Sequence, residues 1–318
     1  MPTIRFILPF VALLAGLLVS CNKSPSQDAS PSLDDSSSSQ ELRLAALSPG
    51  IAVMLRDLGY EDQIVAKHDY DMVLSDRVPA AGSELGFDLE VLIQTNPTHL
   101  FFQKTTAERS PKLLALAKEH GWVIFERPLN TLDDIATTMD DLYFLFEGLP
   151  ERAPRQYDMN EVLGNQTPSV VLANSWDDLG PVADRAGRVL VLGSVDPIGV
   201  MGPGSYHYQI VERLGATPAI DQGSMWIEMD YEDLIALNPD SIIYIAPRQS
   251  SDADRFGESS PMTIEEIRSI FGPIAELPIS AVEHGRIGVI DHPLGLLPSG
   301  ALAQVAEQIG ALIESWDD

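Results

Sequence analysis

Three of the six histidines stand in short segments that follow apolar, strand-like runs or turns. His68 follows Ile64-Val65, His207 follows a Gly-Pro-Gly turn, and His292 follows the apolar run 287–290. Imidazole binds metals and titrates near neutral pH, so these three could contact a metal or its chelator. Binding a bare ion needs three or four converging donors, and spacing alone does not establish convergence. The other histidines adjoin predicted helices or strands and are expected at the surface: His99, His120 and His284.

Aromatic rings and a glycine-rich turn occupy similar segments. Tyr70 follows the second predicted strand, and Trp226 precedes a predicted helix. Exposed rings suit a large flat ligand with apolar faces, although core packing is the competing interpretation for both residues. The run 202–205, Gly-Pro-Gly-Ser, opens a helix whose free amides, with Ser205, could hold an anionic ligand edge; Ser205 could equally be a plain helix cap.

The chain is not expected to be an enzyme. It has no G-x-S-x-G or H-E-x-x-H pattern, and Ser205 with His207 is the nearest approach to a nucleophile and base. Residues two apart at a helix start do not face each other. The only cysteine is Cys21, which excludes intramolecular disulfides and cysteine-based metal or redox motifs.

One sequence pattern occurs twice, as FDLEVLIQTNPTHLFF from Phe87 and MDYEDLIALNPDSIIYI from Met229. In each copy an Asp caps a helix, a Leu-Ile pair is predicted on its buried face, Asn-Pro ends it, and a buried strand follows. The identical pairs are Asp88/Asp230, Glu90/Glu232, Leu92/Leu234, Ile93/Ile235, Asn96/Asn238 and Pro97/Pro239.

A second repeat precedes the first in each half, since the segments 55–59 and 211–215 both end a helix with Leu-Gly. The repeated order of strand, helix, helix and strand predicts two similar α/β lobes with mainly parallel sheets, unless capped helices before strands are alike by chance. A helix with a capping box at Thr131 and Asp134 is predicted between the halves, ending at Gly148. Its buried face would carry Ile135, Met139, Leu142 and Phe146.

The first forty residues differ from the rest. Met1 to Ser20 reads as a secretory signal, and the run ending at Cys21 resembles a bacterial lipobox, which would make Cys21 a lipidation site; a plain signal is the alternative. Residues 22–40 are polar and predicted to be a disordered tether. The remaining chain divides into an N-terminal lobe at 41–129, a bridging region at 130–165 and a C-terminal lobe at 166–318.

The chain is strongly acidic. Its 318 residues include 47 Asp and Glu against 20 Lys and Arg, for a net charge of −27. Polyanions are repelled by such a surface, so nucleic acid is excluded as an expected partner.

An exported, tethered pair of lobes joined by one helix resembles the substrate-binding lipoproteins of ABC importers for vitamin B12, ferric siderophores and haem. The resemblance runs through RLAALSPGIAVMLRDLG from Arg43, TLDDIATTMDDL from Thr131, DPIGVMGPGSYHYQIVERLGA from Asp196 and the duplicated pattern. It implies Rossmann-like lobes joined by a single long helix, a cleft that holds a metal chelate, and no other cofactor. It also implies a monomer, lipid-anchored on the periplasmic or extracellular face, that delivers the chelate to a permease dimer with its ATPase. Glu90 and Glu232 match the family's two permease-docking glutamates.

Ligands of parallel sheets bind outside the carboxyl ends of the strands, which gives a set of candidate ligand-binding residues. These are Ser48, His68, Tyr70, Lys104, Arg127, Ser205, Tyr206, His207, Trp226, Arg248 and His292.

Two features depart from the family pattern. Basic residues near the expected cleft are few, although arginines often face anionic iron chelates. The segment 169–193 holds two strand-like runs where the family usually shows one, which indicates an insertion near Trp176. A receptor for free divalent metal, and a surface sensor lipoprotein without a transporter, are the alternative functions.

Overall fold

The computed structural model describes residues 41–83, 85–105, 110–146, 167–174, 179–246 and 263–316. The predicted signal and tether, Cys21, Gly148, Trp176 and Arg248 lie outside these ranges, so what was predicted for them stays a prediction. Within these ranges, no helix combines the length and the apolar character needed to span a membrane.

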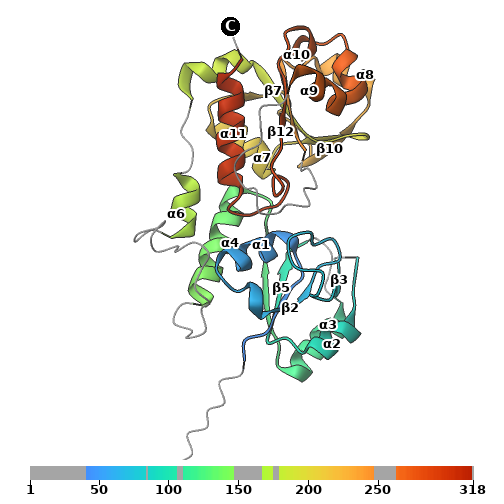
Figure 1. Ribbon diagram of the computed structural model, residues 1–318, viewed down its shortest axis with the longest axis vertical. Helices are drawn as coiled ribbons and strands as arrows, with labels where there is room; N and C mark the ends of the chain where they lie inside the picture. Colours follow the sequence, from blue (N-terminus) through green and yellow to red (C-terminus); the bar gives the residue numbers. More distant parts are fainter. Residues whose placement is uncertain are drawn as a thin grey trace, which may run out of the picture. The chain divides into compact units, whose positions relative to one another are not determined.

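The N-terminal lobe is built on a parallel sheet of four strands, in the order β2-β1-β5-β6 (Figure 1). Its strands are β1 (Leu44–Ala46), β2 (Ile64–Lys67), β5 (His99–Gln103) and β6 (Val123–Arg127). Its helices are α1 (Pro49–Asp57), the 3-10 helix η1 (Glu61–Gln63), α2 (Leu89–Thr95) and α3 (Pro111–His120). A short antiparallel pair, β3 (Gly82–Ser83) and β4 (Gly86–Phe87), precedes α2.

Helices cover both faces of this sheet. Leu44 of β1 packs in one hydrophobic cluster with Ile51 of α1, whereas Ala45 packs in another with Leu92 of α2 and Leu113 of α3. Alternating side chains of a strand point to opposite faces, so β1 is buried on both sides and is apolar throughout. The predicted α/β lobe with a parallel sheet is confirmed.

The C-terminal lobe has a six-stranded sheet with the main order β10-β8-β7-β11-β12, and β9 pairs with β7. Strands β7, β9, β11 and β12 pair in parallel, and β8 pairs antiparallel with both β7 and β10, so the sheet is mainly parallel as predicted. The strands are β7 (Arg188–Val195), β8 (Ile198–Met201), β9 (Thr217–Pro218), β10 (Trp226–Met229), β11 (Ser241–Ile245) and β12 (Ile287–Ile290).

This sheet is also covered on both faces. Val191 of β7 shares a cluster with Ile210 of α7 (Tyr206–Arg213), while Leu192 of the same strand shares a cluster with Leu234 of α8 (Tyr231–Leu237) and Phe271 of α9 (Ile264–Phe271). The helices of this lobe are α7 (Tyr206–Arg213), α8 (Tyr231–Leu237), α9 (Ile264–Phe271), α10 (Ser280–Glu283) and α11 (Leu302–Glu314). Two 3-10 helices, η2 (Gly180–Ala186) and η3 (Gly272–Glu276), complete the described elements.

The predicted bridging helix is α4 (Leu132–Leu145), and its capping box forms as expected. Its buried residues Ile135 and Leu142 belong to a hydrophobic cluster that also includes Ile51 of the N-terminal lobe and Val305 of α11. At its start, the Leu132 amide donates to the Gln209 side chain of α7 at 2.8 Å. Because this core is continuous, we expect the lobes to move little relative to each other.

The first of the two strand-like runs in 169–193 is not a strand. It forms α6 (Pro168–Ala173), whose Ser169 donates from its amide at 2.9 Å and from its hydroxyl at 2.5 Å to the carboxylate of Asp140 on α4. Proline suits a first helical turn, and this anchoring on α4 overrides the β-propensity of the two valines. The prediction of two strands is therefore wrong, and α6 packs with the bridging helix.

The duplicated pattern gives two matched seven-residue helices, α2 and α8. Asp88 and Asp230 cap their N-termini, each accepting from an amide of the first turn. Asn96 and Asn238 end them in the left-handed conformation, with φ of 40° and 46°. Asparagine tolerates this conformation better than most residues, which explains why both copies use it before the proline.

An arginine at the start of the first strand of each lobe fixes the C-terminus of the matched helix. Arg43 donates to the carbonyl of Thr95 at 2.7 Å and to that of Asn96 at 3.2 Å. Arg188 donates to the carbonyls of Leu237 and Asn238. A guanidinium at this end satisfies carbonyls that the helix leaves open and complements the helix dipole.

Replacing either arginine is expected to loosen its helix without unfolding the lobe. Arg43→Ala and Arg188→Ala each remove charge-assisted hydrogen bonds at a half-buried site, worth about 1 kcal/mol. Hydrogen exchange should accelerate in peptides covering 87–97 and 229–239, respectively. Arg213→Ala, which removes an exposed ion pair with Asp133, is the control and should leave both peptides unchanged. Unchanged exchange in the Arg43 and Arg188 variants would contradict the interpretation.

Candidate functional site

The matched helices α2 and α8 each present an acidic and an apolar side chain to solvent. Glu90 and Glu232 are exposed. The isoleucines of the Leu-Ile pairs were predicted to be buried, but Ile93 is 43% and Ile235 is 40% exposed. A helix of two turns buries a single ridge, and Leu92 and Leu234 take that place in both copies.

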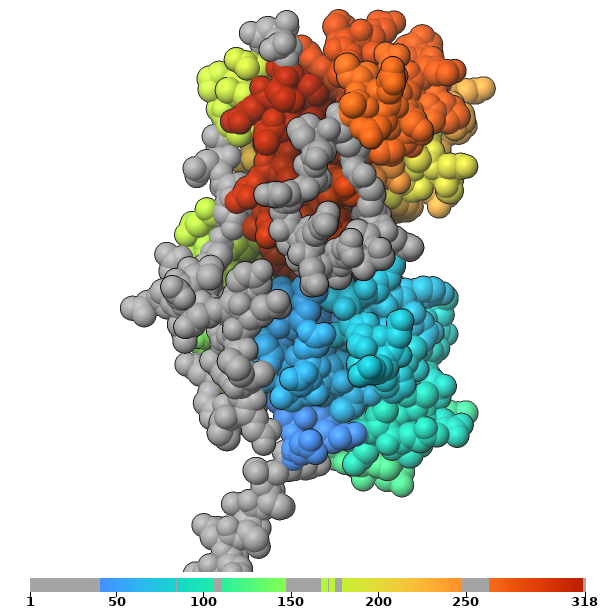
Figure 2. All heavy atoms as spheres, viewed as in Figure 1, coloured from blue at the N-terminus to red at the C-terminus, as the bar shows by residue number. Residues whose placement is uncertain are grey.

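Glutamate and isoleucine three residues apart lie on the same side of a helix. In the N-terminal lobe Glu90 also accepts a hydrogen bond from Gln94 at 3.3 Å. Figure 2 shows teal atoms of the segment around α2 and α3 at the surface of the N-terminal lobe. We call the pair Glu90 and Ile93, and the pair Glu232 and Ile235, the two Glu-Ile surfaces.

Side chains at the start of α7 donate hydrogen bonds to carbonyls of the loop 292–299. Ser205 caps the helix and accepts from the Tyr208 amide at 3.3 Å. Tyr206 donates from its hydroxyl to the carbonyl of Leu296 at 2.7 Å, and burial raises its pKa. His207 lies 2.7 Å from the carbonyl of Gly295 through Nε2, which must donate because a carbonyl only accepts.

His207 is completely buried, and burial lowers its pKa to about 4. Its Nδ1 has no hydrogen-bond partner among the described residues. His292 is also buried: its Nδ1 accepts from the Leu294 amide at 3.2 Å, its Nε2 contacts Gln304 at 2.9 Å, and burial lowers its pKa. His207 is thus neutral near pH 7, and both rings hydrogen-bond residues of the loop 292–299.

In the N-terminal lobe, His68 is buried and Tyr70 is 70% exposed. The Tyr70 amide donates to His68 Nδ1 at 3.1 Å, and the two rings lie 5.7 Å apart. His68 therefore supports the turn that carries Tyr70 outward. Ser48 is buried, and the adjacent Gly50 contacts Pro298 so closely that an added Cβ would lie 2.7 Å from its ring. The start of α1 thus packs on the loop 292–299.

The two basic candidates of this lobe lie at the ends of neighbouring strands, where the Lys104 amide donates to the Arg127 carbonyl at 2.8 Å. Lys104 is exposed. Arg127 pairs with Asp141 of α4 at 2.6 Å and lies over the Phe125 ring at 4.5 Å. Arg127 is thus tied to the bridging helix.

Of the three histidines that were predicted to lie at the surface, two do so. His120 and His284 are exposed. His99 is half-buried, packs near Phe101 and Phe146, and its pKa is lowered by burial. The surface prediction is therefore wrong for His99, because it begins the buried strand β5.

Trp226 stands at the start of the edge strand β10 and is 44% exposed. Its indole lies against Gly193 and Gly199. Neither glycine was among the candidate residues, because a contact across three strands leaves no local sequence signal. His207 did carry a signal, since His207, Ile210, Val211 and Leu214 recur at helical spacing and are all buried.

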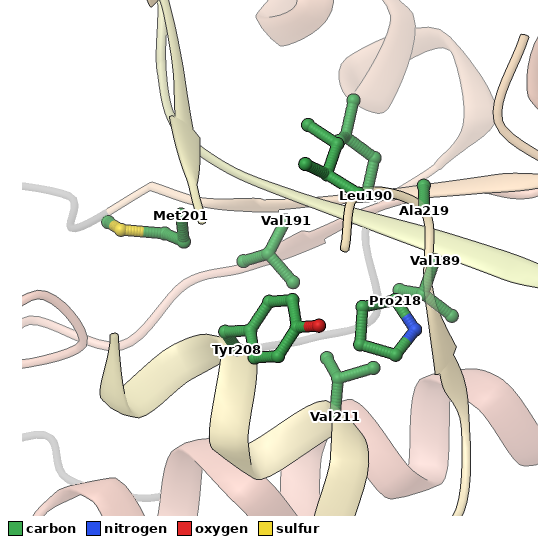
Figure 3. A pocket seen from close by; sticks show the side chains of 9 residues that line it. Val189, Leu190, Val191, Met201, Tyr208, Val211, Pro218 and Ala219 are labelled. Carbon is green, nitrogen blue, oxygen red and sulfur yellow. The ribbon is translucent and has the colours of Figure 1, made fainter. Parts of the chain in front are cut away.

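No candidate residue lines either of two hollows that lie between described elements. In Figure 3, side chains of β7 and α7, including Val191, Tyr208 and Val211, point toward each other around the first. Its volume is about 10 Å³, which leaves room for about one water molecule. The second, about 250 Å³, lies between α4, α6 and the end of α7. The described candidates instead lie in loops, at strand ends and at the start of α7.

The described residues include no group of three or more His, Cys, Asp or Glu side chains placed to hold a metal ion. His68, His207 and His292 each make a hydrogen bond to another described residue.

No protein-family model and no curated protein sequence matches the chain. Solved structures do. The periplasmic vitamin B12 binding protein BtuF of Vibrio cholerae is 16% identical over 86% of this chain and 96% of its own, with a TM-score of 0.56. The periplasmic haem binding protein HutB of Vibrio cholerae is 17% identical over 86% and 99%, with a TM-score of 0.58. A periplasmic haem binding protein of Pseudomonas aeruginosa is 18% identical over 86% and 94%, with a TM-score of 0.57.

Proposed function

We propose that this chain, which has the two-lobed fold of periplasmic binding proteins for vitamin B12 and haem, is the substrate-binding component of an ABC importer. It captures a metal chelate and delivers it to a permease. The observation that carries the proposal is the matched pair of Glu-Ile surfaces, one on each lobe, on helices fixed by the same caps and the same arginine contacts. A partner with two equivalent sites explains why one chain presents the same surface twice.

The docking role of Glu90 and Glu232 rests on their exposure and their matched environments. A basic residue beside an apolar patch is the complement of a Glu-Ile surface, and exposed charge of this kind speeds association. The permease dimer with its ATPase is the partner we propose. Cys21, outside the described residues, is proposed to anchor the chain to the membrane on the periplasmic or extracellular face.

The ligand site is proposed at the exposed candidates Tyr70, Lys104 and Trp226, and at Arg248 outside the described residues. Ser48, His207 and His292 are buried and are proposed to shape this site by holding the loop 292–299. The neighbours are named as binding proteins and not as enzymes, which supports a role in capture without chemistry.

Spectra and calorimetry test this function. The purified protein is expected to bind at least one of haem, cyanocobalamin or a ferric siderophore with a Kd of about 1 µM or tighter, at one ligand per chain. Visible absorption identifies a ligand retained through purification. Heat of binding from Zn²⁺ or Mn²⁺ alone, with none from the chelates, would replace this proposal by a receptor for free metal.

A further inference from the structure

The hollow between α4, α6 and the end of α7 is lined mainly by apolar side chains. Leu132 and Leu172 in its wall are buried, and Val170 is 40% exposed. The small side chains of Ala136 on α4 and Ala173 on α6 leave space beside them. The volume of about 250 Å³ exceeds the roughly 150 Å³ of an apolar cavity that accepts benzene, so a branched chain or a single ring fits.

The two charged side chains that line the hollow form an ion pair. Arg213, the last residue of α7, donates through Nη2 to Oδ1 of Asp133, in the first turn of α4, at 3.0 Å. The side chain of Asp133 is 90% exposed and that of Arg213 is 40% exposed. An exposed pair of this kind contributes little to stability, so both groups can change partners at low cost.

Hydrogen bonds join the three helices around the hollow. Ser169 of α6 donates from its amide and its hydroxyl to the carboxylate of Asp140 on α4. The Leu132 amide of α4 donates to the side chain of Gln209 on α7 at 2.8 Å. The walls are therefore fixed before a ligand arrives, which limits the entropy lost on binding.

The charges at the hollow favour one class of ligand. The net charge of −27 repels an anion, and the guanidinium of Arg213 repels an organic cation. A molecule that carries both a carboxylate and an ammonium group avoids both penalties. Its carboxylate pairs with Arg213 and its ammonium with Asp133, so one ion pair is exchanged for two charge-assisted contacts.

We propose that this hollow binds a zwitterionic α-amino acid with an apolar side chain of about the size of leucine or phenylalanine. The apolar side chain lies against Leu132, Leu172 and Val170, where it leaves water. The carboxylate and ammonium groups face Arg213 and Asp133. None of the residues proposed to hold the chelate lines this hollow, so the inference goes beyond the proposed function.

Titration of the ¹⁵N-labelled protein with L-phenylalanine tests the proposal. Amide resonances of α6 and of the first turn of α4 should shift, with a Kd of about 1 mM or tighter. N-acetyl-L-phenylalanine lacks the ammonium group and L-phenylalaninamide lacks the carboxylate, so each should bind at least about tenfold more weakly. Glycine, which has no apolar side chain, should leave these resonances unchanged.

Variants separate the two parts of the site. Asp133→Asn and Arg213→Gln, both at exposed side chains, should each weaken binding of L-phenylalanine about tenfold. Ala136→Leu fills the hollow, keeps the ion pair and should weaken binding as strongly. Glu265→Gln and Arg268→Gln remove exposed charges from the first and last turns of α9 and are the matched controls, with wild-type affinity expected.

Three results would overturn the proposal. One is the lack of shifts in α4 and α6 at about 10 mM L-phenylalanine. Another is binding of the acetylated or amidated analogue within about twofold of the amino acid, which would exclude recognition of a zwitterion. The third is unchanged affinity in Asp133→Asn and Arg213→Gln. Each would leave the proposed function standing, because haem and cyanocobalamin are titrated separately and bind elsewhere.

Discussion

The double variant Glu90→Ala/Glu232→Ala is expected to lose recruitment to its importer while retaining its ligand. Each carboxylate is exposed on its own lobe, so a single change removes one of two contacts and should weaken binding about tenfold. Loss of both should weaken it about a hundredfold, because the contacts are far apart in the sequence and independent. Binding of the chain to the purified importer in lipid nanodiscs, at several salt concentrations, measures the effect.

The control for this variant exchanges two other exposed carboxylates in first helical turns, Glu61→Ala and Glu265→Ala, one in each lobe. It changes the net charge equally and should leave recruitment intact. The wild-type association rate should fall with salt, and the Glu90/Glu232 variant should show a weaker salt dependence. Equal loss in both double variants would mean that general charge, and not the two Glu-Ile surfaces, governs docking.

The exposure of Ile93 and Ile235 on these surfaces could not be predicted from the sequence. The caps at Asp88 and Asn96 and their copies are local signals, and both helices formed as predicted. Whether Ile93 is buried depends on what the helix packs against, and the sheet has room for only Leu92. The local sequence pattern determines whether a segment is a helix or a strand, whereas tertiary contacts determine which of its faces is buried.

The difference between local sequence and tertiary contact also explains which contacts of the site could be predicted. Arg43 contacts a carbonyl 52 residues away, and Trp226 lies on glycines of two other strands, so neither contact has a sequence signature. The first strand-like run of 169–193 forms the helix α6, whose Ser169 hydrogen-bonds Asp140 of α4, a contact that the local sequence does not indicate. By contrast the helical spacing of His207 with Ile210 and Leu214 does predict its burial, since an apolar stripe at that spacing faces a core.

Stability is expected to fall in weak acid because of His207. The unfolded chain binds a proton at this histidine below about pH 6.5, whereas the folded protein does so only near pH 4. Between these values the unfolded state holds more protons, so the free energy of unfolding decreases as the pH falls. The whole shift corresponds to about 3 kcal/mol. His292, whose pKa is also lowered by burial, acts in the same direction.

His207→Gln isolates this contribution. The glutamine amide can donate to the Gly295 carbonyl as Nε2 does, but it does not titrate. Urea unfolding at intervals from pH 7.5 to 4 should show a stability loss that is smaller by about 3 kcal/mol in the variant. Protonation of the many carboxylates and of His292 is common to both proteins and cancels in the comparison. His284→Gln, at an exposed histidine, should retain the wild-type slope. Parallel curves for wild type and His207→Gln would show that this ring is accessible to protons in the folded state, and that the loop 292–299 does not depend on its neutral form.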